Sequence, residues 1–116
     1  MERVPLSGVE PAEAVDGVHL SQLAAGTEMS VQHFRIDPGA RVPEHSHPHE
    51  QTGYVTAGEL TFLVDGEEVT VSAGDSYAIP GDEPHGAENR GDEPVEGVDI
   101  FAPPRVNPDW DGADES

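Results

Sequence analysis

Turn signals interrupt this chain at short intervals, and this feature limits it to a fold built from short strands. Asp37-Pro38-Gly39 is a turn sequence, and Asp65-Gly66 is the type of two-residue turn that most strongly predicts a β-hairpin. Glycine and proline are frequent, with 13 and 11 residues, and no stretch keeps a helical period. Short strands with turns at intervals of roughly eight to twelve residues predict an all-β, antiparallel sandwich or barrel.

Seven segments have the composition or the alternation of strands, and a loop is expected between the second and the third. The predicted strands cover residues 15–23, 29–36, 53–56, 60–64, 68–72, 76–79 and 95–101, and the loop covers residues 40–48. A chain of 116 residues has room for one domain. We expect an N-terminal arm over residues 1–14, a barrel over residues 15–106 and a flexible acidic tail over residues 107–116.

The charge is strongly unbalanced, with 24 acidic residues against five arginines, no lysine and a formal net charge of −19. Such self-repulsion destabilises a small domain in ordinary buffer, but at molar salt the Debye length falls to about 3 Å. We therefore expect adaptation to a high-salt cytoplasm; an acidic surface for a basic partner is the alternative. Nucleic-acid binding is not expected, because the chain has no basic patch to contact phosphates.

Other classes of protein are disfavoured by what the chain lacks. No apolar run approaches the roughly 20 residues of a membrane helix, and the first residues lack the apolar core of a signal peptide. We expect a cytoplasmic protein with no membrane partner. The chain contains no cysteine, so it has neither disulfides nor thiolate ligands, and a metal would be held by nitrogen and oxygen atoms.

Four residues form a candidate metal site. His45 and His47 are two residues apart, so both rings point to the same side of an extended segment. Gln51 lies in phase with His47 if that strand continues, and His85 follows a turn much later in the chain. Imidazole suits several first-row metals. The clustered His49 is expected to form part of the pocket wall.

The remaining two histidines, His19 and His33, are expected to have structural or surface roles. A solvent-facing histidine loop that binds metal only opportunistically is the alternative to a built site. The histidine loop is the less favoured interpretation, because His85 can supply a further ligand from a distant part of the chain.

The glycines and histidines together resemble the two motifs of the cupin superfamily. The first cupin motif is Gly, five residues, His-x-His, three or four residues, Glu, six residues and Gly; the second is Gly, five residues, Pro-x-Gly, two residues, His, three residues and Asn. The chain matches them, over roughly residues 29–104, with Gly39, His45, His47, Gln51, Gly58, Gly74, Pro80, His85 and Asn89. Gln51 replaces Glu, and Asp82 replaces Gly. The resemblance implies a jelly-roll barrel with one divalent metal ion.

Three strings resemble more specifically the pectin-degradation cupins of the KdgF family, which convert linear unsaturated uronates to keto forms. They are His45-Ser-His-Pro-His-Glu-Gln51, Gly74-Asp-Ser-Tyr-Ala-Ile-Pro80 and Asp99-Ile-Phe-Ala-Pro-Pro-Arg105. In that family two His, a Gln and a third His hold the metal, which implies His45, His47, Gln51 and His85 here. An Asp on the last strand, a Phe and an Arg are implicated in catalysis, which implies Asp99, Phe101 and Arg105.

The expected function is therefore a metal-dependent tautomerisation of a small sugar-derived acid such as an unsaturated uronate. The metal is expected to be Ni, Zn, Fe or Mn, and the substrate to be a small anion. A cupin dioxygenase and a non-enzymatic ligand-binding sensor are the alternatives. Alternation on the last strand separates Asp99 and Phe101 from Val98 and Ile100. An outward apolar pair fits the interface of a homodimer.

Overall fold

The computed structural model describes residues 1–105 and shows an all-β fold with one short 3-10 helix, η1 (Leu6–Gly8). The strands are β1 (Ala12–Val15), β2 (Val18–Ala25), β3 (Ser30–Ile36), β4 (Arg41–His45), β5 (Glu50–Ala57), β6 (Glu59–Val64), β7 (Glu67–Ser72), β8 (Ser76–Ile79), β9 (His85–Glu88) and β10 (Val95–Ala102). None of the helices in this part of the chain has the length and apolar character needed to cross a bilayer. The predicted acidic tail, residues 107–116, lies outside the described residues.

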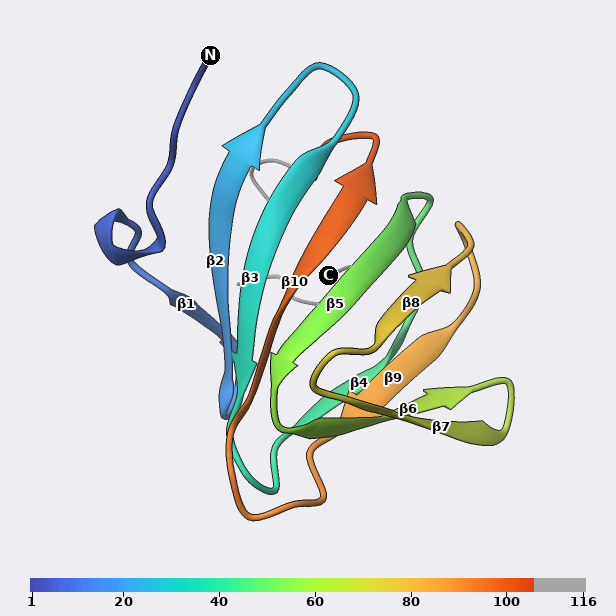
Figure 1. Ribbon diagram of the computed structural model, residues 1–116. Helices are drawn as coiled ribbons and strands as arrows, with labels where there is room; N and C mark the ends of the chain where they lie inside the picture. The colour runs from blue at the N-terminus through green and yellow to red at the C-terminus, as the bar shows by residue number, and fades with distance from the viewer. Residues whose placement is uncertain (106–116) are drawn as a thin grey trace.

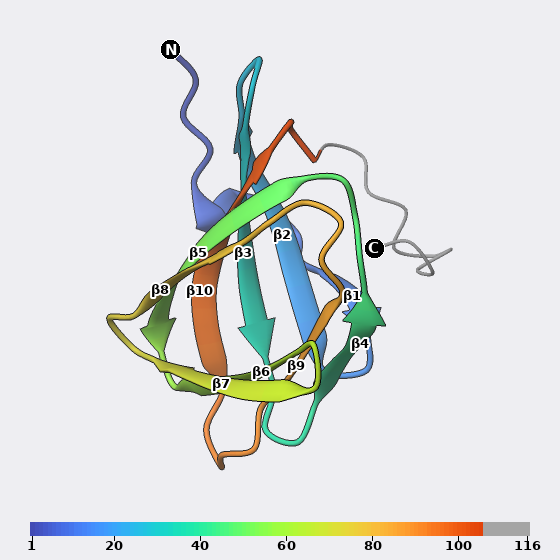
Figure 2. The same cartoon turned by 90° about the vertical axis from the view of Figure 1, so that its right-hand side faces the viewer.

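The strands form two antiparallel sheets that face each other (Figures 1 and 2). The larger sheet has the order β1-β2-β3-β10-β5-β8, and the smaller has the order β4-β9-β6-β7. All pairings within both sheets are antiparallel. This confirms the predicted all-β, single-domain jelly-roll.

Alternation along the strands decides which side chains face the space between the sheets. On β3, Phe34 and Ile36 are buried while Arg35 between them is exposed. On β10 the residues in register with them continue the same inner face, because neighbouring residues across an antiparallel ladder point the same way. The core is apolar at one end of the barrel, with Val18, Phe34, Ile36, Val55, Leu60, Phe62, Val71, Ile79, Ala87 and Val95.

The predicted hairpin at Asp65-Gly66 is confirmed. These two residues connect β6 to β7, and Val64 pairs with Glu67 on either side of them. Both have positive φ, 52° at Asp65 and 77° at Gly66. Positive φ at both central positions is the geometry of the two-residue turn whose twist matches the flanking strands.

Three strands were not predicted, and the sequence shows why. β9 is a four-residue strand that contains glycine and two polar residues, so it has no alternation to detect. β4, which falls in the predicted loop 40–48, contains Pro43. β1 lies mostly in the predicted N-terminal arm and pairs with β2, so the sheet starts at Ala12 and not at residue 15. Long-range pairing, and not local propensity, makes these segments strands.

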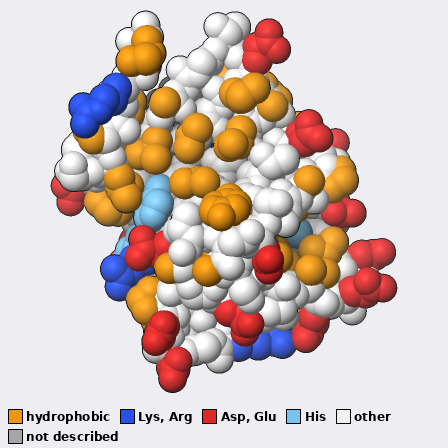
Figure 3. Space-filling view, in the orientation of Figure 1, with side chains coloured by type: hydrophobic (Ala, Val, Ile, Leu, Met, Phe, Trp, Pro, Cys, Tyr) orange, Lys and Arg blue, Asp and Glu red, His pale blue; other side chains and the backbone are white. Residues whose placement is uncertain are grey.

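The outer face of the larger sheet is partly apolar. Figure 3 shows hydrophobic side chains gathered over it, with acidic side chains toward its rim. Tyr54 and Ile100 are exposed there, and together with Val98 they line a shallow groove. The expected outward position of Val98 and Ile100 is thus observed. The homodimer itself stays a prediction.

Candidate metal centre

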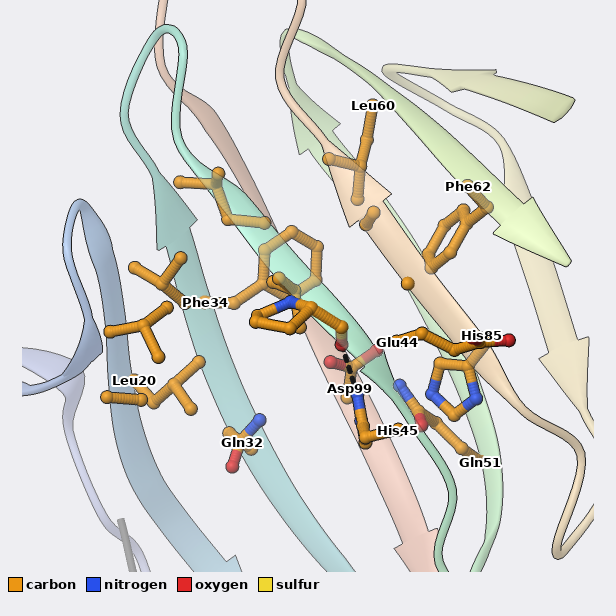
Figure 4. Close-up of a pocket in the computed structure, with 18 of the residues that line it drawn as sticks. Leu20, Gln32, Phe34, Glu44, His45, Gln51, Leu60, Phe62, His85 and Asp99 are labelled. Carbon is orange, nitrogen blue, oxygen red and sulfur yellow. Dashed lines mark hydrogen bonds between the residues drawn. The ribbon is translucent and has the colours of Figure 1, made fainter. Parts of the chain in front are cut away.

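The three predicted histidine ligands come together at one end of the barrel. His45 ends β4 and His85 begins β9, and the two residues are partners in the antiparallel register of the smaller sheet. His47 follows in the connection to β5, on which Gln51 lies. Figure 4 shows His45, His85 and Gln51 pointing into the same cavity. The strand register therefore brings together two motifs that lie nearly forty residues apart in the sequence.

The geometry of the triad suits a metal ion. One ring nitrogen from each of His45, His47 and His85 lies within 4.8 Å of the others. The rings are tilted against one another, with centroids 4.5 Å apart for His45 and His85 and 5.2 Å apart for His47 and His85. His47 and His85 are 6% and 3% exposed, and His45 is half-buried. A His45/His47/His85 cluster of this kind could bind a metal ion.

Backbone carbonyl groups orient all three rings and fix the tautomer of His45 and His85. Nδ1 lies 2.9 Å from the Pro43 carbonyl oxygen in His45 and 2.8 Å from that of Glu83 in His85. A carbonyl oxygen can only accept, so Nδ1 carries the hydrogen in these two rings, and Nε2 keeps its lone pair, as a metal ligand requires. In His47 both nitrogens face an acceptor, since Nδ1 lies 3.2 Å from the carbonyl oxygen of His49 and Nε2 lies 3.1 Å from Gln51 Oε1. Metal binding through Nε2 of His47 would require the hydrogen on Nδ1.

The electrostatic environment keeps two of these rings neutral. The pKa of His47 is lowered to about 4, mainly by burial and to a smaller extent by Arg105 and the other histidines. Burial also lowers the pKa of His45, with smaller contributions from His85 and Arg105. Neutral imidazole is the form that binds metals. His45 and His47 are therefore in their ligating form at neutral pH.

Gln51 connects the histidines to the inner face of the larger sheet. Its Oε1 atom accepts a hydrogen bond from His47 Nε2 over 3.1 Å, so an amide oxygen and an imidazole nitrogen, both possible metal ligands, lie side by side. Its side chain also hydrogen-bonds to Asp99, and toward a carboxylate the amide must donate through its NH₂ group. Glutamate could not donate this bond and would place a second carboxylate against a buried one. This gives a physical reason for the departure from the cupin motif.

The three predicted catalytic residues are buried around the same cavity. Asp99 is 6% exposed, and burial raises its pKa to about 6 against the lowering effect of hydrogen bonds from Tyr77 and Gln51 and of nearby Arg105. Phe101 packs edge-on against the His47 ring. The Arg105 guanidinium carbon lies 5.0 Å from the centre of the Phe101 ring, and its backbone N–H donates to Ser30 Oγ. The predicted inward face of β10 is thus observed.

The other histidines lie outside the triad. The His49 ring packs against Phe101, and among the described atoms its buried Nδ1 has no hydrogen-bond partner. His19 lies 3.0 Å from Asp37, and His33 lies 3.3 Å from Glu96. Those two histidines line a groove on the outer face of the larger sheet, away from the cavity.

The cavity has a polar end and an apolar end. Its volume is about 300 Å³, and Asp99, Gln51 and Glu44 lie near the histidines, whereas Gln32 lies beside Leu20 (Figure 4). The other walls include Leu20, Phe34, Leu60 and Phe62. A small ligand would therefore meet every charged group at one end.

Two polar residues of this cavity were not among the predicted site residues. The Tyr77 hydroxyl donates to Asp99, and Gln32 is buried and pairs with Asp99 in the register of β3 and β10. Tyr77 lies in the string Gly74-Asp-Ser-Tyr-Ala-Ile-Pro80 that resembles the KdgF family, so this string was the signal for it, whereas Gln32 lies in no such string. Both residues lie beside Asp99 because of the strand register, which cannot be read from the sequence.

Comparisons with known proteins agree with this arrangement. Residues 32–101 match the Cupin_2 cupin domain. H2HPP isomerase from Bacillus subtilis is 36% identical over 69 residues, which cover 60% of this chain but only 29% of that protein. Pectin degradation protein KdgF from Dickeya dadantii is 27% identical over 96 residues, covering 82% of this chain and 86% of the relative.

The solved structure of KdgF from a Halomonas species has the same fold. It superposes with a TM-score of 0.84 at 24% identity, over 92% of this chain and 97% of that one. The matched cupin domain spans both histidine motifs and the last strand. The chain therefore belongs to the cupin domain family.

Proposed function

We propose that this protein is a metal-dependent isomerase that converts a small unsaturated, sugar-derived acid to its keto form. The observation that carries the proposal is the position of a buried carboxyl group, Asp99, on the same cavity as His45 and His85, two of three histidines that each bring one ring nitrogen within 4.8 Å of the others. A metal site alone would equally suit binding. A carboxyl group with a pKa near 6 beside it supplies an acid and base for proton transfer.

His45, His47, His85 and the amide oxygen of Gln51 would hold one divalent transition metal, of the Ni, Zn, Fe or Mn type. All four ligands are neutral, so no ligand charge offsets the charge of the ion. When bound, the metal supplies Lewis acidity, which polarises an enol or carboxylate oxygen of the substrate. The site thus attracts an anion inside a protein with a formal net charge of −19.

Arg105, Asp99 and Phe101 have separate roles in binding the substrate and transferring the proton. Arg105 lines the cavity and offers a second positive charge to a substrate carboxylate. Asp99 delivers a proton to the substrate carbon next to the enol. The proton that the enol hydroxyl loses returns, through solvent, to the Asp99 carboxylate, so Asp99 is restored and the product is an isomer of the substrate. Phe101 supports the Arg105 guanidinium and shields the His47 ring from water.

The relatives support the class of reaction. One is named an isomerase and another a pectin degradation protein. Both names fit proton-transfer chemistry or the catabolism of sugar acids more directly than oxygen chemistry. The substrate of this chain is part of the proposal.

The test uses protein loaded with each metal in turn, at high salt, with a linear unsaturated uronate. Ketonisation removes the conjugated chromophore, so ultraviolet absorbance falls, and an oxygen electrode in the same cell reads no uptake. Absence of acceleration over the blank with every metal would overturn the proposal. Oxygen consumption with a flavonol or diketone would assign the chain to the dioxygenases. Tight ligand binding without turnover would assign it to the sensors.

A further inference from the structure

Tyr77 enters the site from β8, a strand that holds none of the candidate metal ligands. In the larger sheet Tyr77 pairs with Gly53 on β5, and Gly53 pairs with Asp99 on β10. Residues in register across an antiparallel sheet project from the same face. Tyr77 and Asp99 therefore lie on the inner face at two strand spacings, about 9–10 Å apart along the sheet, with Gly53 between them.

Glycine at position 53 leaves the space that the tyrosine ring occupies. A Cβ atom there would lie 2.1 Å from Tyr77 Cζ and 2.2 Å from the hydroxyl oxygen, so any side chain would displace the ring. The backbone of Gly53 does not have positive φ. The position requires the absence of a side chain and not a special conformation.

Two further contacts fix the ring once it lies over Gly53. Phe62 packs on it from the facing sheet, with ring centroids 4.7 Å apart. The Tyr77 hydroxyl donates to Asp99 Oδ1 over 2.5 Å. Burial and the Asp99 charge raise the pKa of Tyr77 well above its usual range, so the hydroxyl stays a donor. The hydroxyl has a fixed position and a fixed partner.

We propose that Tyr77 is a positioning residue for Asp99, and that Gly53 is glycine so that Tyr77 can reach it. The inference rests on the proposed function, in which Asp99 transfers a proton at carbon. Such a transfer requires the carboxyl group to be held close to its productive geometry. With Tyr77 on Oδ1 and Gln51 as the second hydrogen-bond donor, the carboxyl group cannot rotate about its Cβ–Cγ bond without losing a buried hydrogen bond.

The first experiment is Tyr77→Phe, which removes only the hydroxyl. We expect kcat with the unsaturated uronate to fall by roughly ten- to a hundredfold, the range found when a supporting hydrogen bond is removed. KM and metal content should stay within about a factor of two, because Tyr77 contacts neither the metal ligands nor a substrate carboxylate. Tyr54→Phe is the matched control, since Tyr54 is exposed on the outer face, and it should leave kcat unchanged. Equal kcat in Tyr77→Phe and wild type would overturn the proposal.

The second experiment tests the glycine. Gly53→Ala should lower kcat to a similar extent, whereas Gly26→Ala, where the added Cβ makes only an ordinary contact at 3.8 Å, should not. Combined with Tyr77→Phe, Gly53→Ala should add little further loss in kcat, because the hydroxyl that it displaces is already gone. Fully multiplicative losses would show that Gly53 acts by another route.

A third measurement separates this inference from the proposed function. In the zinc-loaded protein, a hydroxyl proton in so short a hydrogen bond should give a downfield proton resonance. The signal should persist in Tyr54→Phe and disappear in Tyr77→Phe. If it is present but no metal form turns over uronate, the proposed function fails while the Tyr77–Asp99 contact stands. If turnover is present and Tyr77→Phe keeps its kcat, the positioning role fails while the function stands.

Discussion

The two sheets of the barrel contribute different chemistry to one cavity. The smaller sheet and the connection that follows β4 carry the three histidines, whose rings lie against backbone carbonyls. The larger sheet carries Asp99 and Tyr77, whose side chains are anchored to each other. Gln51 belongs to the larger sheet but contacts both groups. The comparison indicates that metal binding and proton transfer can be removed separately, with Gln51 as the residue that couples them.

Removing a histidine should have the largest effect. His85→Ala takes one of three nitrogen ligands from the smaller sheet, and we expect the purified protein to lose its metal and its activity down to the blank. Metal content by atomic emission is the measurement. His19→Ala, on the outer face, is the control and should keep both. Equal metal content in the two variants would contradict the ligand assignment.

Changing the larger sheet should leave the metal in place. Asp99→Asn keeps the size of the side chain but removes the proton donor, so kcat should fall by about 10²- to 10⁴-fold, as for loss of a general acid or base. Metal content should match wild type. A variant that retained turnover would make Asp99 a structural acid and would leave the proposed division between the sheets without support.

Gln51→Glu should have an intermediate effect and tests the coupling. A carboxylate would cancel part of the charge of the ion and would face the buried Asp99 without donating to it. We expect bound metal to be retained and KM for the uronate to rise about tenfold. The uncharged methyl ester of the substrate is the control, and its KM should change little. A matching rise for the ester would point to distortion of the site instead of charge.

In the metal-free protein, lowering the pH should change the contributions of His47 and Asp99 to folding stability in opposite directions. The pKa of His47 is about 4 in the fold against 6.5 for a free histidine, so the unfolded chain binds more protons between those values and stability falls as the pH drops through this range. The pKa of Asp99 is about 6 in the fold against 3.8. Between these two pKa values the native state binds more protons than the unfolded chain, so the contribution of Asp99 to folding stability rises as the pH drops from about 6 to 4.

The measurement is the unfolding temperature of the metal-free protein at pH 7 and pH 5. His47→Gln should reduce the loss of Tm on acidification, and Asp99→Asn should increase it, each by a few degrees. The same pH dependence in both variants would show that other groups dominate.

The sequence predicted the histidine cluster better than it predicted the surroundings of that cluster. His45 and His47 are close in the chain, and a two-residue spacing has the same meaning in any extended segment. The Asp65-Gly66 turn was predictable for the same local reason. The contacts of Tyr77 with Asp99 depend on a register set across three strands, and β9 forms only because β4 and β6 flank it. Contacts and strands that depend on pairing with distant segments leave no pattern in the local sequence.

The backbone carbonyls that orient the histidines also affect how the site can vary between sequences. Pro43 and Glu83 each contribute a carbonyl oxygen to the neighbouring ring, a group that every amino acid possesses, whereas His49 also packs its ring against His47. Substitutions at Pro43 and Glu83 that keep the path of the main chain leave the tautomers of His45 and His85 unchanged. Varying Pro43, which lines the cavity, would therefore change the shape of the pocket while the carbonyl that orients the His45 ring stays in place.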